Sequence, residues 1–207
     1  MTHTLLNQHP DLAAAIDLYD SWIRFTMHRK LQPGLALGIV YDGELLWGQG
    51  YGDADVEAKT KVTLDTRFRI ASISKTFTAV AILQLRDAGE LSLDDPVARY
   101  LDWFDLQFEG APPITIRNLL THTSGLPRDS HNPMWTECEA PDWDEFVEAL
   151  KTRPPTRPPY QKFAYSNVGY SLLGGIIEQV SGDSWASYLQ ANIVDPLGMS
   201  DTRPVPQ

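Results

Sequence analysis

The sequence of 207 residues predicts an α+β fold, in which an antiparallel sheet is flanked by helices and followed by a helical subdomain. Three observations lead to this prediction. A helical apolar period opens the chain, two apolar runs joined by an Asp-Gly dipeptide come next, and several further helical patterns follow. Strands that occur together, before a run of helices, are typical of α+β folds.

The N-terminal region is predicted to form a helix and a strand pair. Apolar residues recur with a helical period from Asp11 to Lys30, and Pro33-Gly34 marks the end of this helix. The apolar runs Leu35 to Tyr41 and Glu44 to Tyr51 meet at Asp42-Gly43, a dipeptide typical of tight hairpin turns. We therefore expect two adjacent antiparallel strands.

The next predicted element is a helix that starts at about Ser72 and ends near Ala88-Gly89. It is rich in Ala, Val, Ile and Leu on most faces, which indicates burial between other elements. Short helices follow from Leu91 to Ala149, where Thr115 and Asp142 are the expected N-caps.

Two further segments complete the expected order of elements. The doubled Thr-Arg-Pro-Pro of residues 152–159 favours an extended conformation, either as a stiff loop or as a P-x-x-P segment that docks on a recognition domain. An apolar helix is then expected from Tyr170 to Val180.

Ser72 and Lys75 lie three residues apart, where the segment Phe68 to Phe77 passes into an apolar helix. Residues at this spacing share one helix face, so the Lys75 amine can reach the Ser72 hydroxyl. A serine needs such a base, since it is a poor nucleophile near neutral pH. The helix dipole and the apolar neighbours would lower the lysine pKa from its reference value of about 10.4. The alternative is a capping serine beside a solvated lysine.

Tyr165 and Asn167 form a second candidate pair, just after the proline-rich segment. Side chains two residues apart in an extended chain point the same way. A phenol beside an ammonium can share proton transfer, and an asparagine amide can both donate to and accept from a substrate amide. The alternative is an ordinary turn with a buried tyrosine.

These residues resemble two motifs of the serine β-lactamase and penicillin-binding-protein superfamily, S-x-x-K at Ser72 to Lys75 and Y-x-N at Tyr165 to Asn167. The Y-x-N form is similar to that of class C β-lactamases, D-alanyl-D-alanine carboxypeptidases, D-aminopeptidases and related carboxylesterases. Other segments match this branch in the same order: Pro33 to Ala36, Gly50 to Gly52, Leu119 to Pro127 and Pro196 to Met199.

The resemblance implies a β-lactamase/transpeptidase-like fold and a serine hydrolase that forms an acyl-enzyme. Ser72 would attack the substrate, Lys75 and Tyr165 would relay its proton, and Asn167 would orient the substrate. The expected substrates are esters, β-lactams or D-amino-acid amides, and neither a cofactor nor a metal is implied. Three divisions are expected: residues 1–90 with the first helix, the hairpin and the nucleophile helix, 91–160 as the mostly helical subdomain, and 161–207 with the second motif and later helices, ending before the C-terminal strands of the sheet, which are expected to be missing.

A third family motif, K-T-G or H-x-G, does not occur between Tyr165 and Gln207. In the resembling proteins it lies on strands that form one wall of the pocket and supply a second oxyanion N–H, the first being that of Ser72. Loss of one such donor lowers turnover by about a hundred- to a thousandfold. Three alternatives stay open: an active hydrolase, a noncatalytic penicillin-recognising or peptidoglycan-sensing relative, and a truncated fragment that self-associates or needs a complementary C-terminal chain.

Composition narrows the class of protein further. The net charge of −10 argues against nucleic-acid binding and favours a neutral or zwitterionic substrate. A lone cysteine, Cys138, excludes an internal disulfide, and the spacing of the five histidines argues against a catalytic metal. We expect no membrane span, and the absence of a signal-like pattern in Met1 to Pro10 makes cytoplasm the default, or periplasm or secretion if a leader was removed.

Overall fold

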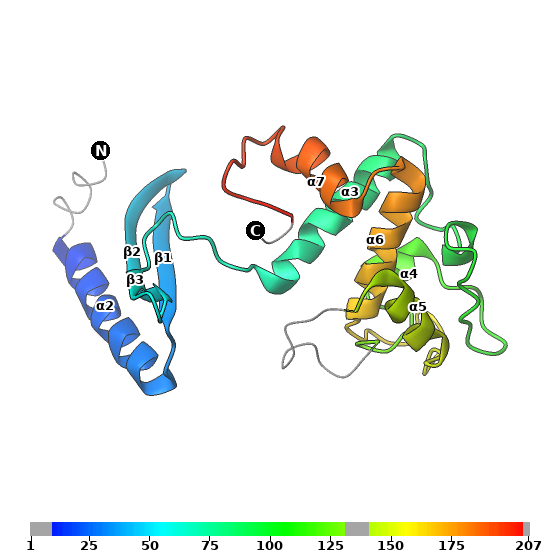
Figure 1. Ribbon diagram of the computed structural model, residues 1–207, viewed down its shortest axis with the longest axis horizontal. Coiled ribbons are helices and arrows are strands. Elements are labelled where there is room, and N and C mark those ends of the chain that lie inside the picture. Colours follow the sequence, from blue (N-terminus) through cyan, green and yellow to red (C-terminus); the bar gives the residue numbers. More distant parts are fainter. Residues whose placement is uncertain (1–9, 131–140, 205–207) are drawn as a thin grey trace. The chain divides into compact units, whose positions relative to one another are not determined.

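The computed structural model describes residues 10–130 and 141–204. The chain divides into an N-terminal unit, Met1–Arg69, and a C-terminal unit, Ile70–Gln207, drawn from blue to red along the chain in Figure 1. This division groups the helix after Ser72 with the later helices, whereas the sequence suggested grouping it with the hairpin; the three-part division stays a prediction. Cys138 and three of the histidines, at positions 3, 9 and 131, lie outside the described residues.

The N-terminal unit consists of helix α2 (Pro10–Lys30) packed on an antiparallel sheet with the strand order β1-β2-β3. Strands β1 (Gly34–Tyr41) and β2 (Glu44–Asp55) form the expected hairpin, and β3 (Thr60–Lys61) is a short third strand that the sequence did not predict. The small core joins Ile23 and Met27 of α2 to Tyr51 of β2. The α+β prediction is confirmed in this unit.

The backbone conformation of the hairpin explains which residues occur at its two ends. Asp42 and Gly43 both have positive φ, 51° and 76°, as a tight turn between twisted strands requires. At the other end of the hairpin, Gly52 also has a positive φ of 70°, and a Cβ there would lie 2.0 Å from the carbonyl oxygen of Pro33. Only glycine fits at this close approach of two backbones.

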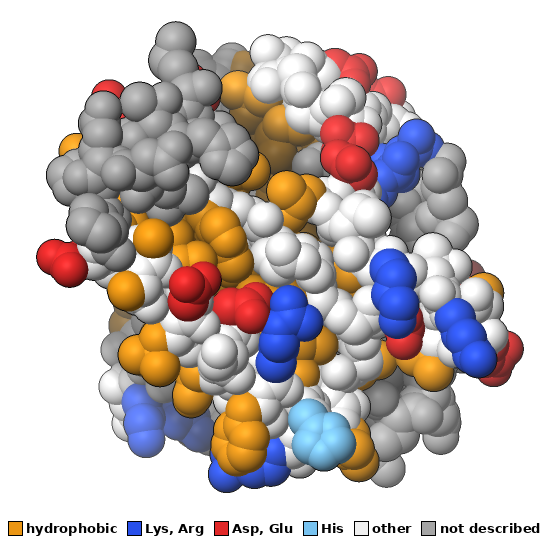
Figure 2. Space-filling view, turned by 90° about the vertical axis from the view of Figure 1, so that its left-hand side faces the viewer, with side chains coloured by type: hydrophobic (Ala, Val, Ile, Leu, Met, Phe, Trp, Pro, Cys, Tyr) orange, Lys and Arg blue, Asp and Glu red, His pale blue; other side chains and the backbone are white. Residues whose placement is uncertain are grey.

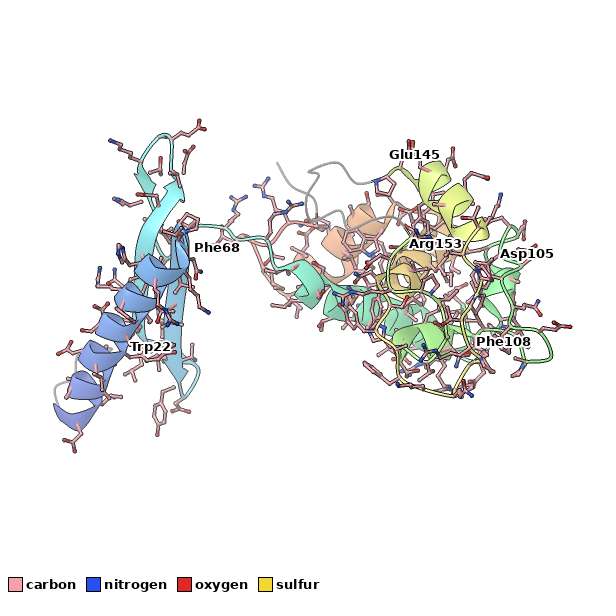
Figure 3. All side chains as sticks on the ribbon, turned by 90° about the horizontal axis from the view of Figure 1, so that it is seen from below. Trp22, Phe68, Asp105, Phe108, Glu145 and Arg153 are labelled. Carbon is pink, nitrogen blue, oxygen red and sulfur yellow. The ribbon has the colours of Figure 1, made fainter. Side chains whose placement is uncertain are left out.

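Helix α2 also carries an apolar stripe on its outer face, formed by Leu18, Trp22 and Phe25. These side chains are 74%, 56% and 62% exposed, and at 100° per residue they fall opposite the sheet-facing Ile23 and Met27. Trp22 is labelled on its helix in Figure 3, and Figure 2 shows hydrophobic side chains on the face that it draws. We call these three residues the outer stripe of α2.

The C-terminal unit is built around two long helices, α3 (Ser74–Asp87) and α6 (Asn167–Ser181). Around them lie α4 (Ile116–Leu120), α5 (Trp143–Lys151), α7 (Trp185–Leu189) and a π-helical turn at Gln190–Val194, with short 3₁₀ turns at Ala71–Ile73 and Val97–Arg99. Fully buried side chains of α3 and α6 form the centre of the core: Ala81, Ile82, Leu172, Leu173, Ile176 and Ile177.

Helix α3 is buried more one-sidedly than its sequence indicates. Thr78, Ala81 and Leu85 face the core, whereas Val80 is 38% exposed and Ile73, just before the helix, is 62% exposed. The helix ends as expected, because Gly89 adopts a positive φ of 80° and the next amide bonds back to the Leu85 carbonyl oxygen.

The expected N-caps are confirmed. Thr115 begins α4 in a capping box with Asn118, and Asp142 begins α5 in a capping box with Glu145. Helix α6 begins three residues before the predicted Tyr170, because Ser166 caps it by accepting a hydrogen bond from the backbone N–H of Gly169. The N-cap Ser166 thus sets the start of α6, although the apolar pattern alone indicated a later start.

The proline-rich segment of residues 152–159 is a stiff loop that lies along residues 121–127. The backbone N–H of Thr156 donates to the Gly125 carbonyl oxygen at 3.0 Å, and that of Tyr160 donates to the Thr123 carbonyl oxygen at 2.8 Å. Pro155 and Pro159 are buried. These contacts favour the loop interpretation over docking on a recognition domain, because the segment already packs against its own chain.

Candidate active site

Ser72 lies in the 3₁₀ turn of Ala71–Ile73, two residues before the first residue of α3, and its side chain is exposed. The preceding Ala71 has a positive φ of 45°. For a residue with a Cβ this backbone conformation costs about 1–3 kcal/mol and is found preferentially at functional sites. The serine thus stands at a strained turn at the N-terminal end of a rigid helix.

Lys75, in the first turn of α3, reaches Ser72 as the three-residue spacing predicts. Its Nζ lies 3.4 Å from Ser72 Oγ, a long contact, and donates a shorter hydrogen bond of 2.7 Å to Asn167 Oδ1. The two sequence motifs, more than ninety residues apart, therefore meet at this one nitrogen.

Tyr165 brings its phenol to the same serine, donating from its hydroxyl to Ser72 Oγ at 2.7 Å. Ser166 between the two motif residues is extended, with φ −134° and ψ 120°, as the spacing of Tyr165 and Asn167 requires. Ser166 is itself 1% exposed and donates from Oγ to the Pro127 carbonyl oxygen at 2.7 Å. This partly buried bond connects the start of α6 to the end of the loop of residues 121–127.

The phenol of Tyr165 sits among groups that favour its ionisation. Partial burial opposes ionisation, but hydrogen bonding with Lys75 and Ser72 and the charges of Lys75 and Arg128 outweigh it, so the pKa of Tyr165 lies below its usual value near 10. The Lys75 Nζ is 5.0 Å from the centre of the Tyr165 ring, and the Arg128 guanidinium is 5.7 Å from it. Such a phenol is suited to accept a proton from a neighbouring hydroxyl.

His122 lies behind this phenol as a neutral packing group. Its Nδ1 accepts a hydrogen bond from the backbone N–H of Ser166 at 3.1 Å, so the ring proton is on Nε2. Its ring centre is 4.6 Å from that of Tyr165 and 5.1 Å from that of Tyr170. Burial, and then the nearby charge of Lys75, lower its pKa. These contacts support a packing role for His122 over proton transfer.

Asp129 and its neighbour Arg128 join the site without any sign in the sequence patterns. Asp129 Oδ1 accepts a hydrogen bond of 2.6 Å from Asn167 Nδ2, and its other oxygen lies 3.5 Å from Arg128 Nε. With the contacts above, the interactions form a closed ring: Ser72, Lys75, Asn167, Asp129, Arg128, Tyr165 and again Ser72. Arg128 and Asp129 could have been found from the sequence only by their position, directly after the family-like segment Leu119 to Pro127.

The described residues contain neither a cluster of metal ligands nor a helix that could span a membrane. Between residues 10 and 130 and between 141 and 204, no three side chains of His, Cys, Asp or Glu gather as metal ligands would. None of the helices in these ranges combines the length and the apolar character needed to cross a bilayer.

Comparison with solved structures defines the class of protein. The chain is 35% identical to the octameric penicillin-binding protein homologue from Pyrococcus abyssi, with a TM-score of 0.80, over 89% of this chain and 43% of that one. It is 33% identical to a class C beta-lactamase from Rhodobacter sphaeroides, with a TM-score of 0.69, over 86% and 48% of the two chains. The protein therefore has the β-lactamase/transpeptidase fold.

A model of the beta-lactamase family matches residues 20–204, so the chain belongs to the beta-lactamase family. Among curated relatives, Protein flp of Staphylococcus aureus (strain NCTC 8325 / PS 47) is 33% identical over 184 residues, which cover 88% of this chain and 37% of flp. The chain thus spans little more than a third of the length of this relative.

Proposed function

We propose that this chain carries the nucleophile of a serine hydrolase that works through an acyl-enzyme. The observation behind this proposal is the pair of contacts at Ser72 Oγ, with the Tyr165 hydroxyl at 2.7 Å and the Lys75 Nζ at 3.4 Å. A serine becomes nucleophilic when an adjacent base can take its proton. Both candidate proton acceptors are within reach of the oxygen that would attack.

Acylation would begin from the phenolate form of Tyr165. Ser72 Oγ attacks the substrate carbonyl carbon while its proton passes to the Tyr165 oxygen, and the Lys75 ammonium stabilises the negative charge of the phenolate before transfer. The proton then moves from Tyr165 to the leaving group as its bond to the carbonyl carbon breaks. A water attacks the ester in the second half of the cycle, by the same proton path in reverse.

Asn167 would orient the substrate with the part of its amide that remains free. Its oxygen accepts from Lys75, and one of its two N–H bonds points to Asp129. An amide nitrogen carries two donors, and within residues 10–130 and 141–204 only Asp129 accepts from this one, so the second N–H can donate to a substrate carbonyl. This supports a substrate with an amide or lactam group near the carbonyl that is attacked.

The proposed substrates are esters, β-lactams or D-amino-acid amides, with no cofactor. The similarity to a penicillin-binding protein homologue and to a class C beta-lactamase supports acyl compounds of this kind. The net charge of −10 favours neutral or zwitterionic substrates over polyanions. The cytoplasmic location expected from the sequence, and its periplasmic or secreted alternative, stay predictions.

The proposal is tested by intact mass after incubation with a fluorophosphonate probe, which reacts with activated serines. We expect one adduct per chain, lost in Ser72→Ala and kept in the matched control Ser74→Ala, one residue into α3. An unmodified but folded native chain would overturn the proposal of an active nucleophile. If that chain still bound a penicillin reversibly, the noncatalytic, penicillin-recognising alternative would be favoured.

The outer stripe of α2 favours a second proposal, that a further segment covers the N-terminal unit. Leu18, Trp22 and Phe25 expose apolar surface on a helix whose opposite face is already buried, and the match to flp covers only 37% of that relative. We propose that a complementary C-terminal segment, on the same polypeptide or on a second one, packs there. Without it the chain is expected to self-associate, and Trp22→Lys is expected to reduce this in sedimentation equilibrium. A native chain that is monomeric at high concentration would contradict this proposal.

A further inference from the structure

The amide of Asn167 is held between two opposite charges. Lys75 Nζ donates to its oxygen at 2.7 Å, and Asp129 Oδ1 accepts from its nitrogen at 2.6 Å. In the flipped orientation the amide nitrogen would face an ammonium, which has only donors, and the amide oxygen would face a carboxylate, which has only acceptors. The two charged groups therefore allow one orientation of the amide.

Asp129 can impose this orientation because its own position is fixed. Its carbonyl oxygen accepts a hydrogen bond of 3.3 Å from Nη1 of Arg153, a residue labelled in Figure 3. The carbonyl oxygen of the preceding Arg128 accepts from the backbone N–H groups of Asn167 at 2.7 Å and Val168 at 3.3 Å. The segment is thus bound to the first turn of α6, where Asn167 lies.

We propose that Asp129 is a positioning residue for the acylation of Ser72. By accepting from the Asn167 amide nitrogen it keeps the amide oxygen facing Lys75, and this holds the Lys75 nitrogen beside Ser72 and Tyr165. The proposal rests on the proposed function, in which Ser72 is acylated. It assigns to the chain an aspartate that acts on the nucleophile through two intervening side chains and does not touch the substrate.

The expected effect of Asp129→Ala is a slower bond-forming step at saturating fluorophosphonate. We expect a decrease of about tenfold, the lower end for a charge-assisted hydrogen bond, because the Asp129 side chain is 29% exposed. The matched control is Asp94→Ala, which removes a carboxylate from a surface ion pair with Arg117 in the same unit and should leave the rate unchanged. Circular dichroism melts of both variants check that they fold.

An exchange of the two side chains separates positioning from a general structural role. Asn167→Asp alone places two carboxylates in contact and should slow acylation at least tenfold. Combined with Asp129→Asn, the amide at position 129 donates to the carboxylate at position 167, which still accepts from Lys75, so both hydrogen bonds return. The double variant should react at least threefold faster than Asn167→Asp. Fluorophosphonates suit this comparison because the probe has no amide for position 167 to orient.

Three results would overturn the proposal: a native acylation rate in Asp129→Ala, a double variant no faster than Asn167→Asp, or a change confined to the affinity for the probe. The last would assign Asp129 to ligand binding instead.

If the native chain forms no adduct and the proposed function itself fails, nuclear magnetic resonance can still test whether Asp129 orients the Asn167 amide. Asp129→Ala should shift the side-chain amide resonances of Asn167 and speed their hydrogen exchange, and unchanged resonances would refute the positioning role regardless of activity.

Discussion

Ser166 is the residue whose removal tests most directly how the site is held in place. Its side chain is 1% exposed, accepts from the backbone N–H of Gly169 at 3.0 Å, and donates to the Pro127 carbonyl oxygen at 2.7 Å. Ser166→Ala removes an N-cap, which costs about 1 kcal/mol, and leaves the partly buried Pro127 carbonyl without this donor, which costs about 1–2 kcal/mol more. We expect the free energy of unfolding of the C-terminal unit to fall by about 2–3 kcal/mol.

Ser184→Ala is the matched control for this loss. Ser184 caps α7 by accepting from the backbone N–H of Ser187 at 3.2 Å, but its side chain is exposed, so its removal should cost only about 0.5–1 kcal/mol. Native-state hydrogen exchange of the α6 amides measures the free energy for this unit alone. Equal losses in the two variants would refute the reasoning, because the bond to Pro127 would then contribute nothing.

Three further predictions concern titration and backbone strain. Because the pKa of Tyr165 lies below about 10, the rate of acylation by the probe should increase with pH, with its midpoint below that value. Tyr165→Phe should lower this rate by about a hundredfold or more and abolish its increase with pH. Burial and the hydrogen bond to Asp20 raise the pKa of Tyr51 to about 12. The protonated phenol therefore stabilises the folded N-terminal unit fully below a pH of about 10, and this contribution is lost as the pH rises through about 12. Ultraviolet titration should show that Asp20→Asn lowers the pKa of Tyr51. At Gly125, φ is 78° and a Cβ would lie 2.1 Å from the Arg157 carbonyl oxygen. Gly125→Ala should therefore lower the free energy of unfolding, measured by urea denaturation, by about 2 kcal/mol or more. An unchanged denaturation midpoint would contradict the close approach of these two backbones.

Elements with local causes could be predicted from the sequence. Asp42-Gly43 specifies its hairpin through the two positive φ angles of the turn, and Thr115 specifies the start of α4 through a hydrogen bond only three residues away. Ser72 and Lys75 come within reach because residues three apart in a helical turn lie on one face. In each case the interaction that fixes the structure joins residues a few positions apart.

The parts that could not be predicted depend on contacts between distant segments. Asp129 meets Asn167 across 38 positions, and only the fold of the loop onto the first turn of α6 brings them together. Likewise, the one-sided burial of α3 depends on which helices pack against it, which the composition of α3 does not encode. The roles of Tyr165 and Asn167 came from family resemblance; their spacing predicted only that they point the same way.

Every side chain in the ring around Ser72 lies between Ile70 and the end of α6, within one compact unit. The groups proposed to activate the hydroxyl are therefore encoded by one continuous stretch of the chain, from the turn before α3 to the first turn of α6. Under the proposed function, the nucleophile and its proton path form one module within the C-terminal unit.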